Sequence, residues 1–165
     1  MNANTQTDFA SYQPSTPKKI TSIAVAITLV AVTAALGSLF TNASVKSDWY
    51  TQNKPKETPP NWVFPIVWTI LYILIAIALS RALLANNIPM IILFIINLML
   101  NVLWCYAYFK RQDPKSALAI ITLLLVTIVA ILAIAYTTDI TILALLVPYL
   151  LWISFATFLN ARTVI

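Results

Sequence analysis

Apolar residues in this chain gather in five long runs that are separated by polar segments. The runs cover about residues 20–40, 62–84, 88–109, 116–137 and 140–160. Each is close to the ~20 residues that a helix needs to cross the hydrocarbon core of a bilayer. Apolar and polar residues do not alternate within the runs, as they would in the strands of a transmembrane barrel. Because a backbone in lipid must satisfy its own hydrogen bonds, the pattern predicts an all-α, polytopic membrane protein with a five-helix transmembrane domain over residues 20–165.

The first 19 residues differ from this pattern. They are rich in Asn, Thr, Gln, Ser and Pro and end in Lys18-Lys19. Such a polar segment cannot bury enough apolar surface to fold, so we expect a disordered tail over residues 1–19. The apolar run that follows is longer than the ~7–15 residues of a signal-peptide core, which favours a retained span.

Three of the four connections between the runs are short. They contain typical turn residues, such as Asn86-Asn87, and predict that consecutive helices are antiparallel neighbours. Five spans place the two ends of the chain on opposite sides. Lys18, Lys19 and Arg81 then lie on one side, whereas Lys46, Lys54, Lys56, Lys110, Arg111, Lys115 and Arg162 lie on the other. This excess of basic residues predicts that the first loop, the third loop and the carboxyl end face the cytoplasm.

The composition excludes several functions. The chain has no histidine and one cysteine, Cys105, so no zinc, haem or copper site of the usual kind is expected, and no cofactor is required. None of the five acidic residues lies midway along an apolar run, which argues against a proton relay and against a catalytic carboxylate in the membrane. The net charge of +5 falls on chain ends and loops and indicates membrane orientation rather than a nucleic-acid surface.

The connection over residues 41–61 is much longer than the others. It contains Trp49-Tyr50 and then Pro55, Pro59 and Pro60. Two interpretations fit this composition. Trp49 and Tyr50 could anchor the loop at the membrane interface while the loop only spans a gap between helices. Alternatively, the prolines stiffen the loop into a semi-rigid lid over one mouth of the helix bundle, since loops of this length are often functional.

Three of the predicted helices carry aromatic or amide side chains at helical spacing. They are Trp68 and Tyr72 on the second helix, Asn97, Asn101 and Trp104 on the third, and Tyr149, Trp152 and Ala156 on the fifth. Amides are costly in lipid, so the stripe on the third helix must face protein or ligand. Either the asparagines join helices and the aromatic rings only pack, or these faces line an apolar cavity with a few polar groups. The second arrangement is typical of a small-molecule site and favours a flat, conjugated ligand.

The motifs resemble those of a known family. They are Trp49-Tyr50, PPNWVFPIVWTILY at 59–72, NVLW at 101–104 and PYLLWISFATFLN at 148–160. In these stretches, which run in order across nearly all of the chain after residue 20, the sequence resembles the tryptophan-rich sensory protein family. Mitochondrial members are called translocator protein or peripheral benzodiazepine receptor. The resemblance implies a five-helix membrane protein, commonly a homodimer, that binds porphyrins such as protoporphyrin IX and, in some members, cholesterol or synthetic drugs.

By motif position, the resemblance implies a role for individual residues. Tyr50 and Pro59 lie in the lid, Trp68 and Tyr72 form one wall, Asn97 and Asn101 supply polar contacts, and Trp152 and Ala156 form the opposite wall. Two departures stand out. Glu57 replaces an aromatic residue that family members usually have before the paired prolines, which implies a less apolar and more mobile lid. The carboxyl end, 158–162, lacks the tyrosine of the cholesterol-recognition pattern, which argues against cholesterol binding.

The resemblance therefore implies an integral membrane tetrapyrrole receptor, sensor or transport-associated protein. Two alternatives belong to other classes. Some family members are reported to degrade protoporphyrin in light, and Trp68 and Trp152 would then be candidate redox partners. The other alternative is a transporter. Transporters often have broken helices, and Pro65 and Pro148 could break the second and fifth predicted helices.

Overall fold

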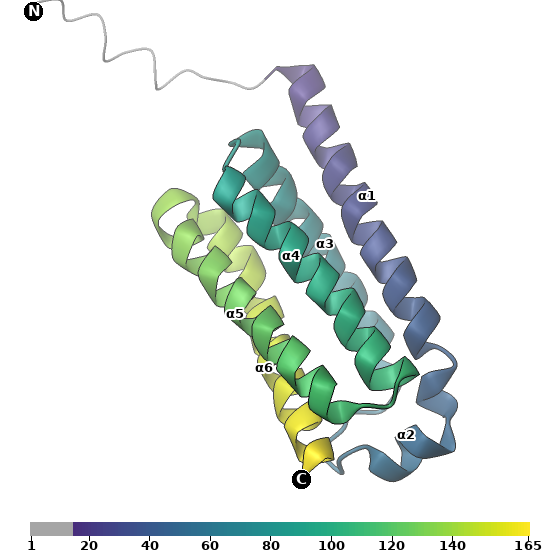
Figure 1. Cartoon of the computed structure of the whole chain (residues 1–165). Helices are drawn as coiled ribbons and strands as arrows, with labels where there is room; N and C mark the ends of the chain where they lie inside the picture. The colour runs from purple at the N-terminus through teal and green to yellow at the C-terminus, as the bar shows by residue number, and fades with distance from the viewer. Residues whose placement is uncertain (1–14) are drawn as a thin grey trace, which may run out of the picture.

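The computed structural model describes residues 15–165, which form helices and turns and contain no strand (Figure 1). The five long helices are α1 (Thr16–Thr41), α3 (Val63–Leu84), α4 (Ile88–Cys105), α5 (Pro114–Thr138) and α6 (Ile140–Val164). Helix α4 continues into a π-helical turn, η2 (Tyr106–Lys110), and the first loop contains the short helices η1 (Ser44–Lys46) and α2 (Asp48–Asn53). All five long helices are long and apolar enough to cross a membrane, which confirms the predicted all-α five-helix class.

The predicted tail lies mainly on residues 1–14, outside the described residues. Its last part belongs to α1, which begins at Thr16 rather than at residue 20. Pro17 explains this earlier start. It stands in the first helical turn, where the fixed φ of proline suits a helix and no amide hydrogen is needed.

The long helices form a closed ring. Around the ring, α1 contacts α3, α3 contacts α6, α6 contacts α5, α5 contacts α4, and α4 returns to α1. Figure 1 shows that the beginning of α1 lies at one end of the bundle, whereas α2 and the carboxyl end of α6 lie at the other. We call the end beside α2 the loop end and the opposite one the closed end.

The short connections are built from residues that suit tight turns. Asn86 and Gln112 adopt positive φ angles of 50° and 55°, a conformation that asparagine tolerates better than most residues. Asn87, Asp113 and Asp139 then cap α4, α5 and α6, because the side-chain oxygen of each accepts a hydrogen bond from a backbone amide of the first turn. These turns explain why consecutive long helices run antiparallel.

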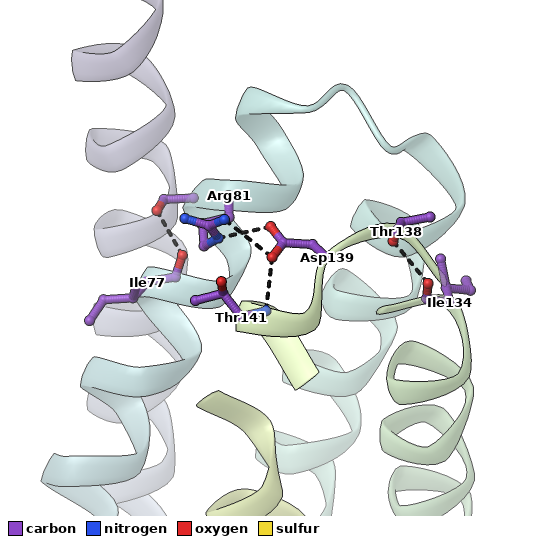
Figure 2. Close-up of polar contacts among 7 residues, drawn as sticks. Ile77, Arg81, Ile134, Thr138, Asp139 and Thr141 are labelled. Atoms are coloured by element: carbon purple, nitrogen blue, oxygen red, sulfur yellow. Dashed lines mark hydrogen bonds and ion pairs between the residues drawn. The ribbon is translucent and has the colours of Figure 1, made fainter. Parts of the chain in front are cut away.

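An ion pair joins two elements at the closed end (Figure 2). Arg81, near the end of α3, donates from Nε to Asp139 Oδ2 at 2.8 Å and from Nη2 to Asp139 Oδ1 at 3.2 Å. The same carboxylate accepts the amide of Thr141 at 3.0 Å. Burial raises the pKa of Asp139, but the hydrogen bonds from Arg81 and Thr141 outweigh this effect and leave the pKa below its usual value. Asp139 therefore ties α3 to the turn between α5 and α6.

Candidate ligand-binding cavity

A cavity of about 520 Å³ lies at the loop end, between α1, the beginning of α3, the end of α4 and the first loop. This volume lies within the ~300–1,000 Å³ that is usual for ligand sites. Most of its wall is apolar or aromatic, and polar side chains from the end of α1 and the loop complete it. The cavity is larger than a groove of about 380 Å³ between α3 and α6 and a crevice of about 30 Å³ beneath the first loop.

Small residues on α1 create the space. Ala34, Gly37 and Ser38 face the cavity from this helix. Gly37 is the one glycine of the chain. A Cβ at this position would lie 3.6 Å from Cys105 Sγ and 3.9 Å from the hydroxyl oxygen of Tyr72, which is ordinary contact distance. The helix backbone at Gly37 therefore forms part of the wall directly, and any side chain larger than a methyl group would extend into the cavity.

Helix α3 supplies the aromatic wall. Trp68 and Tyr72 lie one turn apart and their ring centroids are 5.2 Å apart, as the spacing of four residues predicts. Phe64 lines the cavity one turn earlier on the same face. Trp68 also contacts Tyr149 of α6 edge to face, with 6.4 Å between the ring centroids. These rings offer a flat surface on which a conjugated ligand can stack.

The end of α4 forms another part of the wall, and a wide helical turn shapes it. In η2, Arg111 N donates to Tyr106 O at 2.9 Å, five residues back rather than four. Phe109, inside this turn, and Trp104, just before it, both line the cavity. The Trp104 indole is fixed by Asn160, whose Oδ1 accepts from Nε1 at 3.1 Å.

The first loop covers the cavity with buried aromatic residues. Tyr50 of α2 is only 4% exposed and lines the cavity, and its ring packs on that of Phe109 with 5.8 Å between centroids. Burial raises the pKa of Tyr50 to about 12, so this phenol is neutral at physiological pH. Trp49 packs edge to face on Tyr108 with 5.8 Å between centroids. The loop therefore points Trp49 and Tyr50 toward the bundle, which favours the lid over the interface-anchor interpretation.

The two candidate asparagines do not line the cavity. Asn97 and Asn101 are each 1% exposed and belong to a hydrogen-bonded network between helices. Tyr72 donates to Asn101 Oδ1 at 3.3 Å, Asn101 Nδ2 donates to the Tyr149 hydroxyl at 3.4 Å, and that hydroxyl donates to Asn97 Oδ1 at 2.8 Å. Asn97 Nδ2 in turn donates to Thr127 Oγ1 at 2.8 Å. The amides thus join α3, α4, α5 and α6, and Tyr72 connects this network to the cavity.

The predicted site residues fall into two groups. Tyr50, Trp68, Tyr72 and Trp104 come together around the cavity, whereas Pro59, Asn97, Asn101, Tyr149, Trp152 and Ala156 lie outside its lining.

Trp152 and Ala156, the expected opposite wall, lie outside this cavity. Trp152 lines a separate groove between α3 and α6, and Ala156 lines a small crevice beneath the loop. Three residues advance a helix by 300°, so Trp152 is rotated about 60° from Tyr149 and faces the flank of α6. The wall that completes the cavity comes from α1.

Sequence reasoning missed several lining residues. They are Gly37, Lys46, Phe64, Cys105 and Phe109. A single glycine within an apolar span was the available signal for the first, because glycine lets another group approach the backbone closely. The others depend on which helices are neighbours, which helical spacing alone does not give.

The fold and the cavity define this chain as a small five-helix membrane protein with an aromatic cavity beneath its first loop. Comparison with known proteins identifies its family. Residues 24–165 match the model of the TspO/MBR family. The chain is 40% identical over 149 residues to the tryptophan-rich protein TspO of Chlorobaculum tepidum, which covers 87% of this chain and 94% of that protein. It is also 36% identical over 123 residues to a tryptophan-rich sensory protein of Cereibacter sphaeroides. This match covers 73% of this chain and 78% of that protein.

The tryptophan-rich protein TspO of Archaeoglobus fulgidus is 41% identical to the chain over 129 residues. This match covers 75% of this chain and 82% of that protein. The chain therefore belongs to the TspO/MBR family and is an integral, multi-pass membrane protein. The resemblance found in the sequence motifs is confirmed.

Proposed function

We propose that the cavity binds a flat, hydrophobic tetrapyrrole such as protoporphyrin IX, and that the protein acts as a membrane receptor or sensor or in a transport-associated role. The observation that carries this proposal is the cavity of about 520 Å³ lined by Trp68, Tyr72 and Trp104 beneath an aromatic lid. Stacking on these rings and burial of a large apolar area suit a flat macrocycle. The name of the Cereibacter sphaeroides relative, a sensory protein, supports the sensor role.

Binding to the purified protein in detergent tests the proposal. The shift of the main porphyrin absorption band reports binding without relying on the tryptophans. Trp68→Ala removes part of the stacking wall, and we expect it to weaken binding of protoporphyrin IX roughly tenfold. Trp62→Ala is the matched control, because Trp62 is 67% exposed at the beginning of the same helix and does not line the cavity. Equal affinities of the two variants would place the binding site elsewhere.

Trp152→Ala gives a second, sharper control. Trp152 packs on Phe64 with 5.7 Å between ring centroids but lies in the groove outside the cavity. We expect its variant to bind much more like Trp62→Ala than like Trp68→Ala. A loss as large as that of Trp68→Ala would mean that the ligand occupies the groove between α3 and α6 instead.

Light-dependent porphyrin degradation is the second candidate. Oxidisable side chains, Trp68, Tyr72 and Trp104, surround the cavity, and a bound photosensitiser would lie next to them. Illumination of the complex in air should then give a new pigment that requires both the protein and light. Trp68→Phe should slow its formation more than Trp62→Phe does, and a product that forms equally fast without the protein excludes this activity.

The proposal also includes the orientation and the assembly. From the basic residues of the first loop we infer that the mouth of the cavity faces the cytoplasm, and the family resemblance supports a homodimer. The native Cys105 is buried, so a cysteine introduced at exposed Thr51 provides a clean labelling site. In sealed cells, a membrane-impermeant maleimide should leave Thr51→Cys unlabelled until the membrane is opened.

A further inference from the structure

The cavity has two chemically different ends. Its inner part is lined by buried groups, among them Gly37, Trp104 and Cys105. Its mouth, where α1 ends and the loop begins, is lined by the exposed polar residues Asn42, Lys46 and Asn61. The α1 residues that line the cavity begin at Ala34 and continue for about two turns, a rise of about 10 Å by Thr41. A ligand that fills the cavity therefore meets an apolar environment at one end and a polar one at the other.

Among the residues that the structure describes, Lys46 is the one basic residue in the cavity lining, and no acidic residue from this part of the chain shares the lining with it. The two ion pairs in residues 15–165 join Arg81 to Asp139 and Arg162 to Glu57, so neither engages Lys46. Lysines near the ends of spanning helices lay their aliphatic stem along apolar surface and keep the ammonium in water. The ammonium of Lys46 is thus available to an anionic group at the mouth.

We propose that Lys46 makes the cavity selective for amphiphilic anions, with the flat apolar body inside and a carboxylate at the mouth. This inference rests on the proposed function and specifies its ligand class and binding direction. A carboxylate placed among Trp104, Cys105 and Gly37 would lose its water and find no cationic partner, which is strongly unfavourable. At the mouth it keeps part of its hydration and gains the ammonium of Lys46. The amides of Asn42 and Asn61 add further donors there.

The test compares two compounds that share one macrocycle but differ in charge. Protoporphyrin IX carries two carboxylates, and its dimethyl ester carries none. We expect Lys46→Gln to weaken binding of the diacid roughly two- to fivefold, as for a solvent-accessible ion pair, and to leave the diester unchanged. Lys46→Glu, which places like charges together, should weaken the diacid roughly tenfold. Both losses should shrink as salt is added.

Lys56→Gln is the matched control. Lys56 lies in the same loop and is exposed, but it does not line the cavity, so we expect wild-type affinity for both compounds. Because each variant is compared with wild type for the same compound, differences in how the two compounds partition into detergent cancel.

The possible outcomes separate this inference from the proposed function. If both compounds bind with the sensitivity to Trp68→Ala described above, but the Lys46 variants change neither affinity, the charge selection is wrong and the tetrapyrrole site stands. If neither compound binds in a Trp68-dependent manner, the proposed function itself fails. An anionic lipid headgroup has the same chemistry as the ligand carboxylate. If Lys46→Gln weakens the diacid only when phosphatidylglycerol is added to the neutral detergent, Lys46 serves a lipid and the inference is overturned.

Discussion

The two ends of the bundle are built from the same five helices but are filled in different ways. At the closed end, the helices meet through fully buried aliphatic and aromatic side chains, such as Leu79, Phe94, Ile131 and Leu146. At the loop end, Gly37 and Ala34 of α1 face the rings of α3 and α4 across a cavity. The comparison shows that the shape of the facing side chains, rather than the helix arrangement, decides whether the interior is solid or hollow.

Physical reasons explain the difference. Flexible or branched aliphatic side chains interdigitate and fill the space between helices to the density of a solid. Rigid indole and phenol rings have few rotamers, and Trp68 and Tyr72 are already held by each other and by the network through Asn101. These rings cannot rotate toward the small residues of α1, so the cavity between them stays open.

Removing a large side chain from the closed end should have the largest effect on stability. Phe94 is 1% exposed, so Phe94→Ala leaves a void there. We expect the free energy of unfolding to fall by about 2–3 kcal/mol. This is at or below the smallest losses for the same substitution in soluble proteins, because lipid supplies part of the apolar environment. Thermal unfolding in detergent should show this as a lower Tm. Phe158→Ala, at a position 46% exposed on α6, is the control and should melt close to wild type.

Filling the hollow end should affect binding instead of stability. Gly37→Phe puts a ring into the cavity, and we expect it to weaken protoporphyrin IX at least tenfold, or about 1.4 kcal/mol. Gly37→Ala is the conservative partner, because its methyl group meets Cys105 and Tyr72 at ordinary contact distances. It should keep most of the affinity and raise the Tm slightly, since alanine favours a helix by about 0.5–1 kcal/mol over glycine. Unchanged affinity of Gly37→Phe would contradict the location of the site.

The hydrogen-bonded network around Asn97, Asn101 and Tyr149 should contribute moderately to the stability of the bundle. Tyr149→Phe removes the hydroxyl that bonds Asn97 and Asn101, and we expect it to cost about 0.6–1.7 kcal/mol, from the average to the largest value for hydrogen bonds between membrane helices. The matched control is Tyr136→Phe, because Tyr136 is 73% exposed at the end of α5. Comparable Tm values for the two variants would show that the amides find other partners.

The ion pair at the closed end should have the smallest effect, and it depends on pH. The pKa of Asp139 is lower in the folded protein, so its contribution is complete above the ordinary pKa of about 3.9 and disappears as the pH falls through the lowered value. Asp139→Asn keeps a good helix cap but removes the charge. We expect it to cost less than about 1 kcal/mol at pH 7 and nothing at acid pH, because the pair is partly exposed.

Differences in Tm between wild type and Asp139→Asn at several pH values measure this effect. The pKa of Asp113 is also lowered, mainly by hydrogen bonds from Ser116, but Asp113 is present in both proteins and its contribution cancels. A difference that stays constant down to acid pH would contradict the assignment to the ion pair.

The sequence predicted more of the fold than of the site. The lengths of the apolar runs were sufficient to predict five membrane-spanning helices. The spacing of four residues was sufficient to predict that Trp68 and Tyr72 contact each other. The spacing of Asn97 and Asn101 predicted that both share a buried face, but not that Tyr149 and Thr127 would satisfy them. Partners on other helices depend on the order of the helices around the ring, which no single helix encodes.

The position of Trp152 outside the cavity has a different physical reason. A shared face was inferred for Tyr149, Trp152 and Ala156, yet a rotation of about 60° is enough to turn a large indole from the interior to the flank of a helix. The small residues of α1 have no ring or amide group, so the pattern of aromatic and polar residues did not reveal that they line the cavity. At Ala34 and Gly37, what matters is the volume they leave empty.

The π-helical turn η2 has a consequence for how this site can vary. A turn closed by a bond from Arg111 to Tyr106 contains one residue more than an α-helical turn. Ala107, Tyr108 and Phe109 follow one another in this turn and are all buried. Loss or gain of a single amino acid here would rotate the inward-facing side chains by about 100° while the rest of α4 keeps its register. A change confined to this turn would therefore alter the lining of the cavity without rebuilding the bundle.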